Sequence, residues 1–169
     1  MGEGMTGWYY LNVSVHLLAA LLWLGGMFFF AAVGAPTLRK VEPPELRAEL
    51  FRRLGEQFRT VGWAAIATLL VTGILNLHFR GLLRAGVWGN ADFWASPWGH
   101  ALAWKLAAVA VMVVISGLHD FVFGPAASRL TPGSPASLRM RRRASWLARI
   151  NALVGLVLVI AAVRLARGG

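Results

Sequence analysis

The sequence contains no cysteine and little acidic charge: 7 Asp and Glu residues stand against 17 Lys and Arg, for a formal net charge of +10. Without cysteine the chain can form no disulfide, cysteine-ligated zinc or iron–sulfur centre, or thiol nucleophile. Only 14% of the residues are charged and 57% are apolar, whereas an average soluble domain is about 25% charged. This composition excludes a disordered chain and argues against a soluble nucleic-acid-binding domain, so we expect no nucleic-acid partner.

Long runs without charge define the fold class. A helix needs about 20 mainly apolar residues to cross the hydrocarbon core of a bilayer. Four segments meet this requirement, so the sequence predicts an all-α bundle of four transmembrane helices, forming a single integral membrane domain over residues 1–169. The predicted helices cover residues 8–34, 60–80, 98–123 and 146–166. No internal repeat is recognisable in the sequence.

The basic residues of the loops predict the orientation, because Lys and Arg accumulate on the cytoplasmic side. Six basic residues lie between helices 1 and 2 and five lie between helices 3 and 4, against two between helices 2 and 3. We therefore expect a multi-pass protein of a bacterial-type inner membrane with both termini outside. Leu46, Leu50, Leu54 and Phe58 are spaced by four, which predicts a short amphipathic helix on the cytoplasmic surface, either separate from helix 2 or continuous with it. The loop between helices 3 and 4 is expected to be an irregular linker that ends in a basic patch.

Polar residues inside the membrane are the candidates for function, because each is costly there. His16 and Lys105 lie about 12 Å and 10 Å below the outer ends of their helices, and His78 and His100 lie near the same surface. His119 and Asp120 fall near the inner surface, so His119 is not expected to share a metal ion with His16. The remaining polar candidates are Asn12, Ser14, Thr68, Thr72, Asn76, Ser116, Arg149 and Asn151.

His16 belongs to a stripe along helix 1 with Asn12, Trp23 and Met27. An imidazole next to a large aromatic ring, with a gap at Gly25-Gly26, suits a porphyrin, which needs an axial nitrogen and flat apolar walls. The same stripe is also the pattern of plain helix packing, and a lone histidine can simply bond a neighbouring helix. Both interpretations remain open at this point.

Lys105 stands out because the chain has 15 arginines and only two lysines. A buried amine can hold a carboxylate, move a proton or bind a metal when neutral, which arginine cannot do equally well; the alternative is that its side chain reaches the outer headgroups. His78 and His100 share a depth at which they could bind one outer metal ion, or simply face solvent.

Two stretches resemble known membrane proteins. His16, Trp23, Gly26 and Phe28, together with the Trp104-Lys105-Leu106 helix, resemble the small haem-containing proteins of the HemJ type, which oxidise protoporphyrinogen IX. The wider stretch is similar to the copper-resistance D family, through Leu22 to Met27, Ala35-Pro36, Leu46 to Arg59, Leu70 to Gly73 and Ser96 to Gly99. The resemblance implies a haem b site at His16, with Trp23, Gly26 and Met27 as neighbours and Lys105 as catalytic or propionate partner.

The main functional expectation is thus a b-type haem protein with a redox role, either electron transfer or oxidation of a lipophilic quinol or porphyrinogen. One alternative is a copper uptake or tolerance protein with His78 and His100 as an outer metal entry. Another is a cofactor-free scaffold or small transporter. Gly25-Gly26 and Gly73 would allow close packing in a homo-oligomer within the lipid bilayer.

Overall fold

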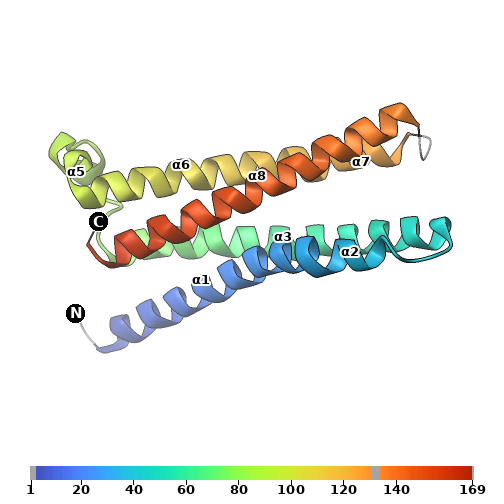
Figure 1. Cartoon of the computed structure of the whole chain (residues 1–169). Coiled ribbons are helices and arrows are strands. Elements are labelled where there is room, and N and C mark those ends of the chain that lie inside the picture. The colour runs from blue at the N-terminus through green and yellow to red at the C-terminus, as the bar shows by residue number, and fades with distance from the viewer. Residues whose placement is uncertain (1–2, 131–133, 169) are drawn as a thin grey trace. The chain divides into compact units, whose positions relative to one another are not determined.

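The computed structural model describes residues 3–130 and 134–168, and these residues are almost entirely helical, with no strand among them (Figure 1). The chain divides into two compact units, residues 1–88 and 89–169, and each is a hairpin of two long helices. Four helical segments are long and apolar enough to cross a membrane, which confirms the predicted all-α class and the four spans. They are Thr6–Leu38, Pro44–Phe79, Pro97–Ala126 and Pro135–Ala166.

The two hairpins have the same order of elements. The first comprises α1 (Glu3–Phe29), η1 (Phe30–Gly34), α2 (Ala35–Leu38) and α3 (Pro44–Phe79), followed by the short α4 (Ala85–Trp88). The second begins with the short α5 (Ala91–Ala95) and continues with α6 (Pro97–Gly117), η2 (Leu118–Phe123), α7 (Gly124–Ser128) and α8 (Pro135–Ala166). Here η marks a stretch of wider π-helix. In both hairpins the first long helix thus passes through a π-helix and a short helix before the loop.

Proline explains the two π-helices. Pro36 and Pro125 each follow a π-helix by one residue. A proline lacks the N–H that would bond four residues back, and its ring presses on that carbonyl. In the wider turn the N–H of Ala35 bonds Phe30 O and that of Gly124 bonds His119 O, five residues back. The π-turn therefore lets each helix continue past its proline.

Serine and proline also fix where the second hairpin's long helices begin. Pro97 and Pro135 occupy the first helical position, where proline has no intrahelical bond to lose. The hydroxyls of Ser96 and Ser134 accept from the N–H groups of Gly99 and Ser137 at 3.0 and 3.2 Å. Such caps satisfy backbone donors that a helix start leaves open.

Two predicted boundaries are corrected. The amphipathic segment 46–58 is not a separate helix but the first part of α3, where Arg52 and Arg53 pair with Glu49 at 2.7 and 2.6 Å and Arg52 with Glu56 at 3.0 Å. Pairs three or four residues apart support a helix at its surface. The loop before helix 4 is likewise shorter than expected, because α8 begins at Pro135. The basic patch, Arg139 to Arg143, therefore belongs to this helix and not to the loop. The good helix formers Leu, Met, Arg and Ala of this stretch favour that outcome.

The structure also reveals a repeat that the sequence hides. Pro36 and Pro125 lie 89 residues apart, and the same offset relates the buried positions of the two hairpins. On the first helices it pairs Asn12 with Ala101 and Trp23 with Met112; on the second it pairs Gly62 with Asn151, Ile66 with Gly155 and Thr72 with Ala161, and all ten are buried. The hairpins are therefore two versions of one structural unit with different side chains.

Candidate functional site

Four polar side chains meet between α1 and α3, in the half of the hairpin that lies away from the α2 loop. Asn12 donates through Nδ2 to the backbone oxygen of Thr72 and to Oδ1 of Asn76, both at 3.0 Å. His16 Nδ1 lies 2.7 Å from the hydroxyl of Thr72. We call Asn12, His16, Thr72 and Asn76 the α1–α3 cluster. Asn12 and Thr72 are buried, with 8% and 6% of their surface exposed.

The hydrogen bonds of Thr72 determine which nitrogen of His16 carries the proton. The Thr72 hydroxyl donates to the backbone oxygen of Thr68 at 2.6 Å, one turn earlier on α3. Its single proton is then used, so Thr72 Oγ1 accepts and His16 Nδ1 donates. In the neutral imidazole Nε2 is consequently the unprotonated nitrogen. Metal-binding histidines are commonly held in this way, by a bond from the ring nitrogen that does not bind the metal.

Helix geometry brings the cluster together. Asn12 and His16 are four residues apart on α1, as are Thr72 and Asn76 on α3, so each pair lies on one helix face. Gly73 lies beside the imidazole, since a Cβ there would be in ordinary van der Waals contact with His16 Cε1 at 3.7 Å. From the sequence alone, Thr72 and Asn76 are recognisable only as polar residues of helix 2. Their spacing of four, matched to that of Asn12 and His16, is the signal that identifies them as partners.

The polar contacts continue from the cluster to the end of the hairpin. Arg80, one turn beyond Asn76, donates to the Tyr9 hydroxyl at 3.1 Å. Tyr9 lies one turn before Asn12 on α1. The pair of Tyr9 and exposed Arg80 thus lies one turn from the α1–α3 cluster, nearer the end of the hairpin.

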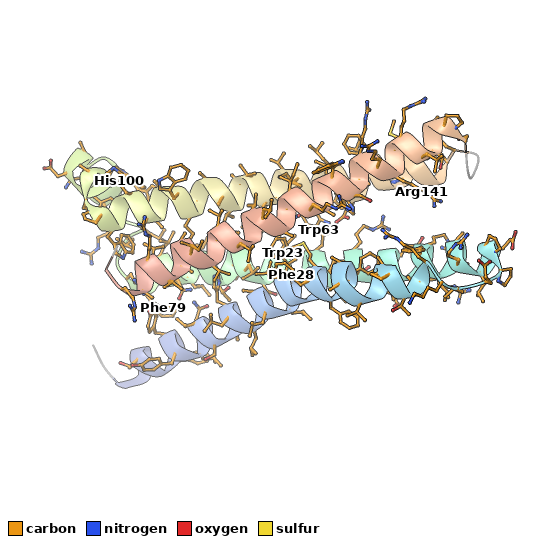
Figure 2. The ribbon with its side chains drawn as sticks, in the orientation of Figure 1. Trp23, Phe28, Trp63, Phe79, His100 and Arg141 are labelled. Atoms are coloured by element: carbon orange, nitrogen blue, oxygen red, sulfur yellow. The ribbon has the colours of Figure 1, made fainter. Side chains whose placement is uncertain are left out.

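The rest of the predicted haem stripe serves helix packing. Trp23 is 5% exposed, and its Cδ1 lies 4.0 Å from where a Cβ on Gly62 would stand. At Gly26 a Cβ would lie only 2.7 Å from Phe58 Cε2, so the Phe58 ring occupies the gap in which a flat ligand was expected. Met27, which follows Gly26 on α1, is half-buried. Figure 2 shows Trp23 near Phe28, in the part of α1 that leads to η1.

His78 and His100 are both exposed and belong to different hairpins. His78 lies near the end of α3, with its ring edge-on to Phe79 at a centroid distance of 5.9 Å. His100 lies in the first turn of α6 (Figure 2). Among the described contacts of the first hairpin, no side-chain hydrogen bond joins His78 to the α1–α3 cluster. Their role as metal ligands stays a prediction.

Lys105 is half-buried on α6. The offset of 89 that relates the two hairpins pairs Lys105 with His16. The two residues therefore hold equivalent positions in the first long helix of each hairpin, 20 residues before Pro36 and Pro125. At this position each hairpin has a nitrogen-containing basic side chain. The equivalence of His16 and Lys105 is not visible when helix 1 and helix 3 are considered separately.

The second hairpin has a polar group of its own, close to the α7 loop. Asn151 on α8 donates through Nδ2 to the hydroxyl of Ser116 on α6 at 2.9 Å. One turn further along, His119 Nδ1 lies 2.7 Å from Asp120 Oδ1. We call Ser116, His119, Asp120 and Asn151 the α6–α8 cluster.

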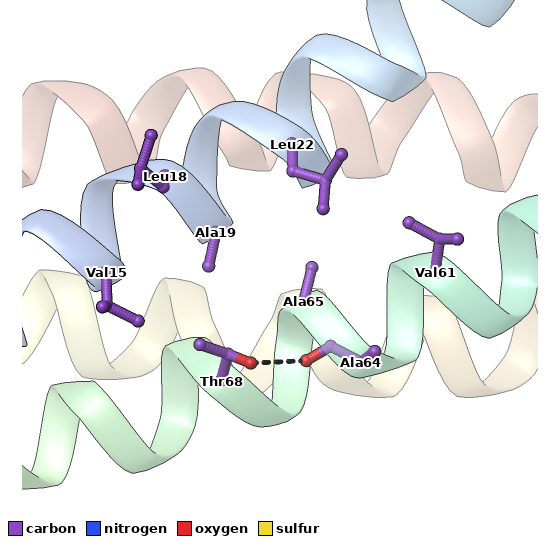
Figure 3. Close-up of a pocket in the computed structure, with 8 residues that line it drawn as sticks. All are labelled: Val15, Leu18, Ala19, Leu22, Val61, Ala64, Ala65 and Thr68. Carbon is purple, nitrogen blue, oxygen red and sulfur yellow. Dashed lines mark hydrogen bonds between the residues drawn. The ribbon is translucent and has the colours of Figure 1, made fainter.

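An apolar cleft opens between α1 and α3 next to the α1–α3 cluster (Figure 3). Its volume is about 360 Å³, and apart from Thr68 its lining is apolar, with Ala19, Ala64 and Ala65 as its smallest side chains. Thr68, the polar residue in its lining, donates its hydroxyl to Ala64 O at 2.9 Å, as the dashed line in Figure 3 shows. The cleft can accept an alkyl chain but offers no free donor from Thr68.

The described part of the chain contains no group of three or more His, Cys, Asp or Glu side chains that could hold a metal ion. A metal bound within one of these hairpins would have to combine an imidazole with amide and hydroxyl oxygens. The α1–α3 and α6–α8 clusters each contain one imidazole together with amide and hydroxyl groups.

Comparison with known proteins decides the family. The family model described as Copper resistance protein D matches residues 52–165, about two thirds of the chain. The protein belongs to the copper resistance protein D family. An uncharacterized protein of Aquifex aeolicus (strain VF5) is 32% identical over 159 residues, which cover 94% of this chain and 95% of that protein. No solved structure matches.

Membership of the copper resistance protein D family confirms the resemblance noted in the sequence and identifies a multi-pass membrane protein of a copper-resistance family. Among the functions left open above, it favours the copper alternative over the haem protein that was the main expectation. The matched region begins within α3 and covers the whole second hairpin. It thus includes Thr72 and Asn76 of the first cluster and all of the second.

Proposed function

We propose that this protein binds copper inside the membrane, for copper uptake or tolerance, and that His16 is the principal ligand of the α1–α3 cluster. The observation that carries the proposal is the bond between His16 Nδ1 and Thr72, which leaves Nε2 as the unprotonated nitrogen. Family membership supplies the metal. Copper is the cargo in this account and not a resident cofactor.

The donor set favours copper(II). Soft sulfur ligands select copper(I), whereas nitrogen and oxygen ligands suit copper(II). The chain has no cysteine, and the α1–α3 cluster provides a nitrogen ligand, Nε2 of His16, whose other ring nitrogen is held by Thr72. Tyr9 and Arg80, which bond each other one turn beyond the cluster, would provide polar groups nearer the end of the hairpin.

Haem b at His16 is the competing proposal, since the same Nε2 could bind iron. A porphyrin also needs flat apolar walls. Phe58 closes the space beside Gly26, and Trp23 packs on Gly62. These residues do not fit a porphyrin at this place unless Phe58 moves away, and we derive no chemistry through haem.

The proposal is tested with purified protein in lipid nanodiscs, by an optical spectrum as isolated followed by a copper(II) titration. We expect no Soret band and saturable copper binding that His16→Ala weakens at least tenfold. His78→Ala and His100→Ala test the other predicted metal ligands, because each removes an exposed imidazole, and the binding that His16→Ala weakens should persist in both. Equal binding by His16→Ala and the unaltered protein would overturn the proposal. A Soret band that His16→Ala abolishes would replace it with haem.

A further inference from the structure

We propose that the α6–α8 cluster is a second copper(II) site, in which His119 and Asn151 are ligands and Asp120 positions the imidazole. This inference rests on the proposed copper function, but it uses different residues in a different hairpin. The cluster lies at the end of the second hairpin nearest the α7 loop. Four observations support it.

The first is a carboxylate within an apolar span. Asp120 is the single acidic residue between positions 97 and 166 of the sequence, and it lies within the segment long enough to cross the membrane. An ionisable residue in such a segment is costly and commonly marks a pathway for ions or protons.

The second is the pairing of that carboxylate with an imidazole. His119 Nδ1 and Asp120 Oδ1 are 2.7 Å apart. With the carboxylate as acceptor, Nδ1 donates and Nε2 of the neutral ring carries the lone pair. A carboxylate that bonds the other ring nitrogen orients a metal-binding histidine and makes it more basic. The pair thus has the chemistry of an imidazole ligand and its supporting group.

The third is a buried oxygen that lacks a partner. Asn151 Oδ1 makes no hydrogen bond with any described residue, although Asn151 and Ser116 are each only 5% exposed. An amide oxygen left unsatisfied in an apolar interior is destabilising. A cation coordinated by this oxygen, with the Ser116 hydroxyl beside it, would remove that penalty.

The fourth is the local backbone. His119 and Asp120 lie within η2, which packs against α8, and Ser116 precedes them by three and four residues. Residues at this spacing are neighbours on one helix face. π-helical turns frequently occur at functional sites. Pro125 accounts for the π-turn. The paired side chains of His119 and Asp120 therefore stand on η2, directly after the helical segment that contains Ser116.

The two clusters lie at opposite ends of their hairpins. His16 precedes η1 by 14 residues, about 21 Å of helix, whereas His119 is part of η2. If both arginine-rich loops face the cytoplasm, as their charge predicts, one site would serve each membrane surface. Copper would then meet an acceptor at entry and another at exit.

The test is a copper(II) titration of the whole protein in nanodiscs, with electron paramagnetic resonance of the bound metal. We expect two equivalents of copper in the unaltered protein, one in His16→Ala, one in His119→Ala and none in the double variant. Asp120→Asn keeps the size of the side chain but weakens the carboxylate support, so the second site should lose about 10–100-fold in affinity. Asn151→Leu should lose the second equivalent while the apolar side chain preserves the fold.

Ser137→Ala is the matched control. Ser137 Oγ is also buried without a partner among the described residues, but it lies in the first turn of α8, so the variant should keep both equivalents. Loss of one equivalent in His16→Ala with no change in His119→Ala would overturn the second site alone. The reverse pattern would overturn the His16 proposal and leave this one standing. An unaltered protein that binds no copper would overturn both.

Discussion

His16 donates through Nδ1 to the hydroxyl of Thr72, 2.7 Å away, because that hydroxyl already donates to Thr68 O. A threonine bonded back to its own helix thereby sets the protonation of an imidazole on a neighbouring helix. In a membrane such a bond also joins two spans without any charged group. Both the packing of the first hairpin and its proposed chemistry depend on this contact.

Replacing Thr72 by valine tests that contact. Thr72→Val keeps the branched shape but removes the oxygen that accepts from His16. We expect copper(II) affinity at the first site to fall about 10–100-fold, the usual cost of losing a supporting group behind a metal ligand. Thr72→Ser retains the hydroxyl and should remain within a few-fold of the unaltered protein. Equal affinities for the valine and serine variants would show that the bond does not support a ligand.

Gly26 and Gly25 form a matched pair for the packing of α1 on α3. A Cβ on Gly26 would lie 2.7 Å from Phe58 Cε2, whereas one on Gly25 would meet nothing within 4 Å. Gly26→Leu should therefore destabilise the protein by about 1–3 kcal/mol, as overpacking commonly does. Gly25→Leu should have little effect. The unfolding midpoint in a denaturing detergent measures both, and equal midpoints would contradict the assigned helix face.

Two variants of Lys105 separate the role of its charge from that of its exchangeable proton. Lys105→Met keeps the apolar stem and removes the ammonium, whereas Lys105→Arg keeps a charge that does not leave. If Lys105 acts in transport as an anchor for an anionic group, Arg should preserve copper flux and Met should lose it. If Lys105 exchanges a proton, both variants should lose flux. Full flux in Lys105→Met would show that the side chain only reaches the headgroups.

Orientation is tested by cysteine labelling of the naturally cysteine-free chain. A cysteine at Gly89 should react with a membrane-impermeant thiol reagent in intact cells, and one at Ser134 should not, because basic loops resist translocation. The Arg149 guanidinium lies 5.4 Å from the centre of the Trp146 ring, so it folds back toward the basic start of α8. The opposite labelling pattern would reverse the membrane sides assigned to the two clusters.

The sequence predicts the helical spans well because charge-free runs of sufficient length have few alternatives in a membrane. It predicts less about their ends: α8 extends through Arg139 to Arg143, since prolines that suggest a linker also suit a first helical turn. The stripe of Asn12, His16 and Trp23 is visible in the sequence, but its neighbour is not. Only the structure shows Thr72 and Asn76 opposite it and Phe58 beside Gly26.

The same limit applies to the repeat and to the second cluster. The two hairpins share an 89-residue offset in buried positions but few identical residues, because many apolar side chains can fill equivalent places. His119 and Asp120 stand out in the sequence as neighbours. The contact between Ser116 and Asn151, and the packing of η2 on α8, join different helices, which no spacing within one helix reveals.

Copper flux into sealed proteoliposomes tests the central claim most directly. The vesicles would contain a copper-sensitive fluorescent probe and either the unaltered protein, His16→Ala or His78→Ala. The account predicts copper-dependent signal with the unaltered protein and His78→Ala, and a signal with His16→Ala no greater than that of protein-free vesicles. Undiminished flux in His16→Ala, or unaltered protein that behaves like empty vesicles, would contradict it.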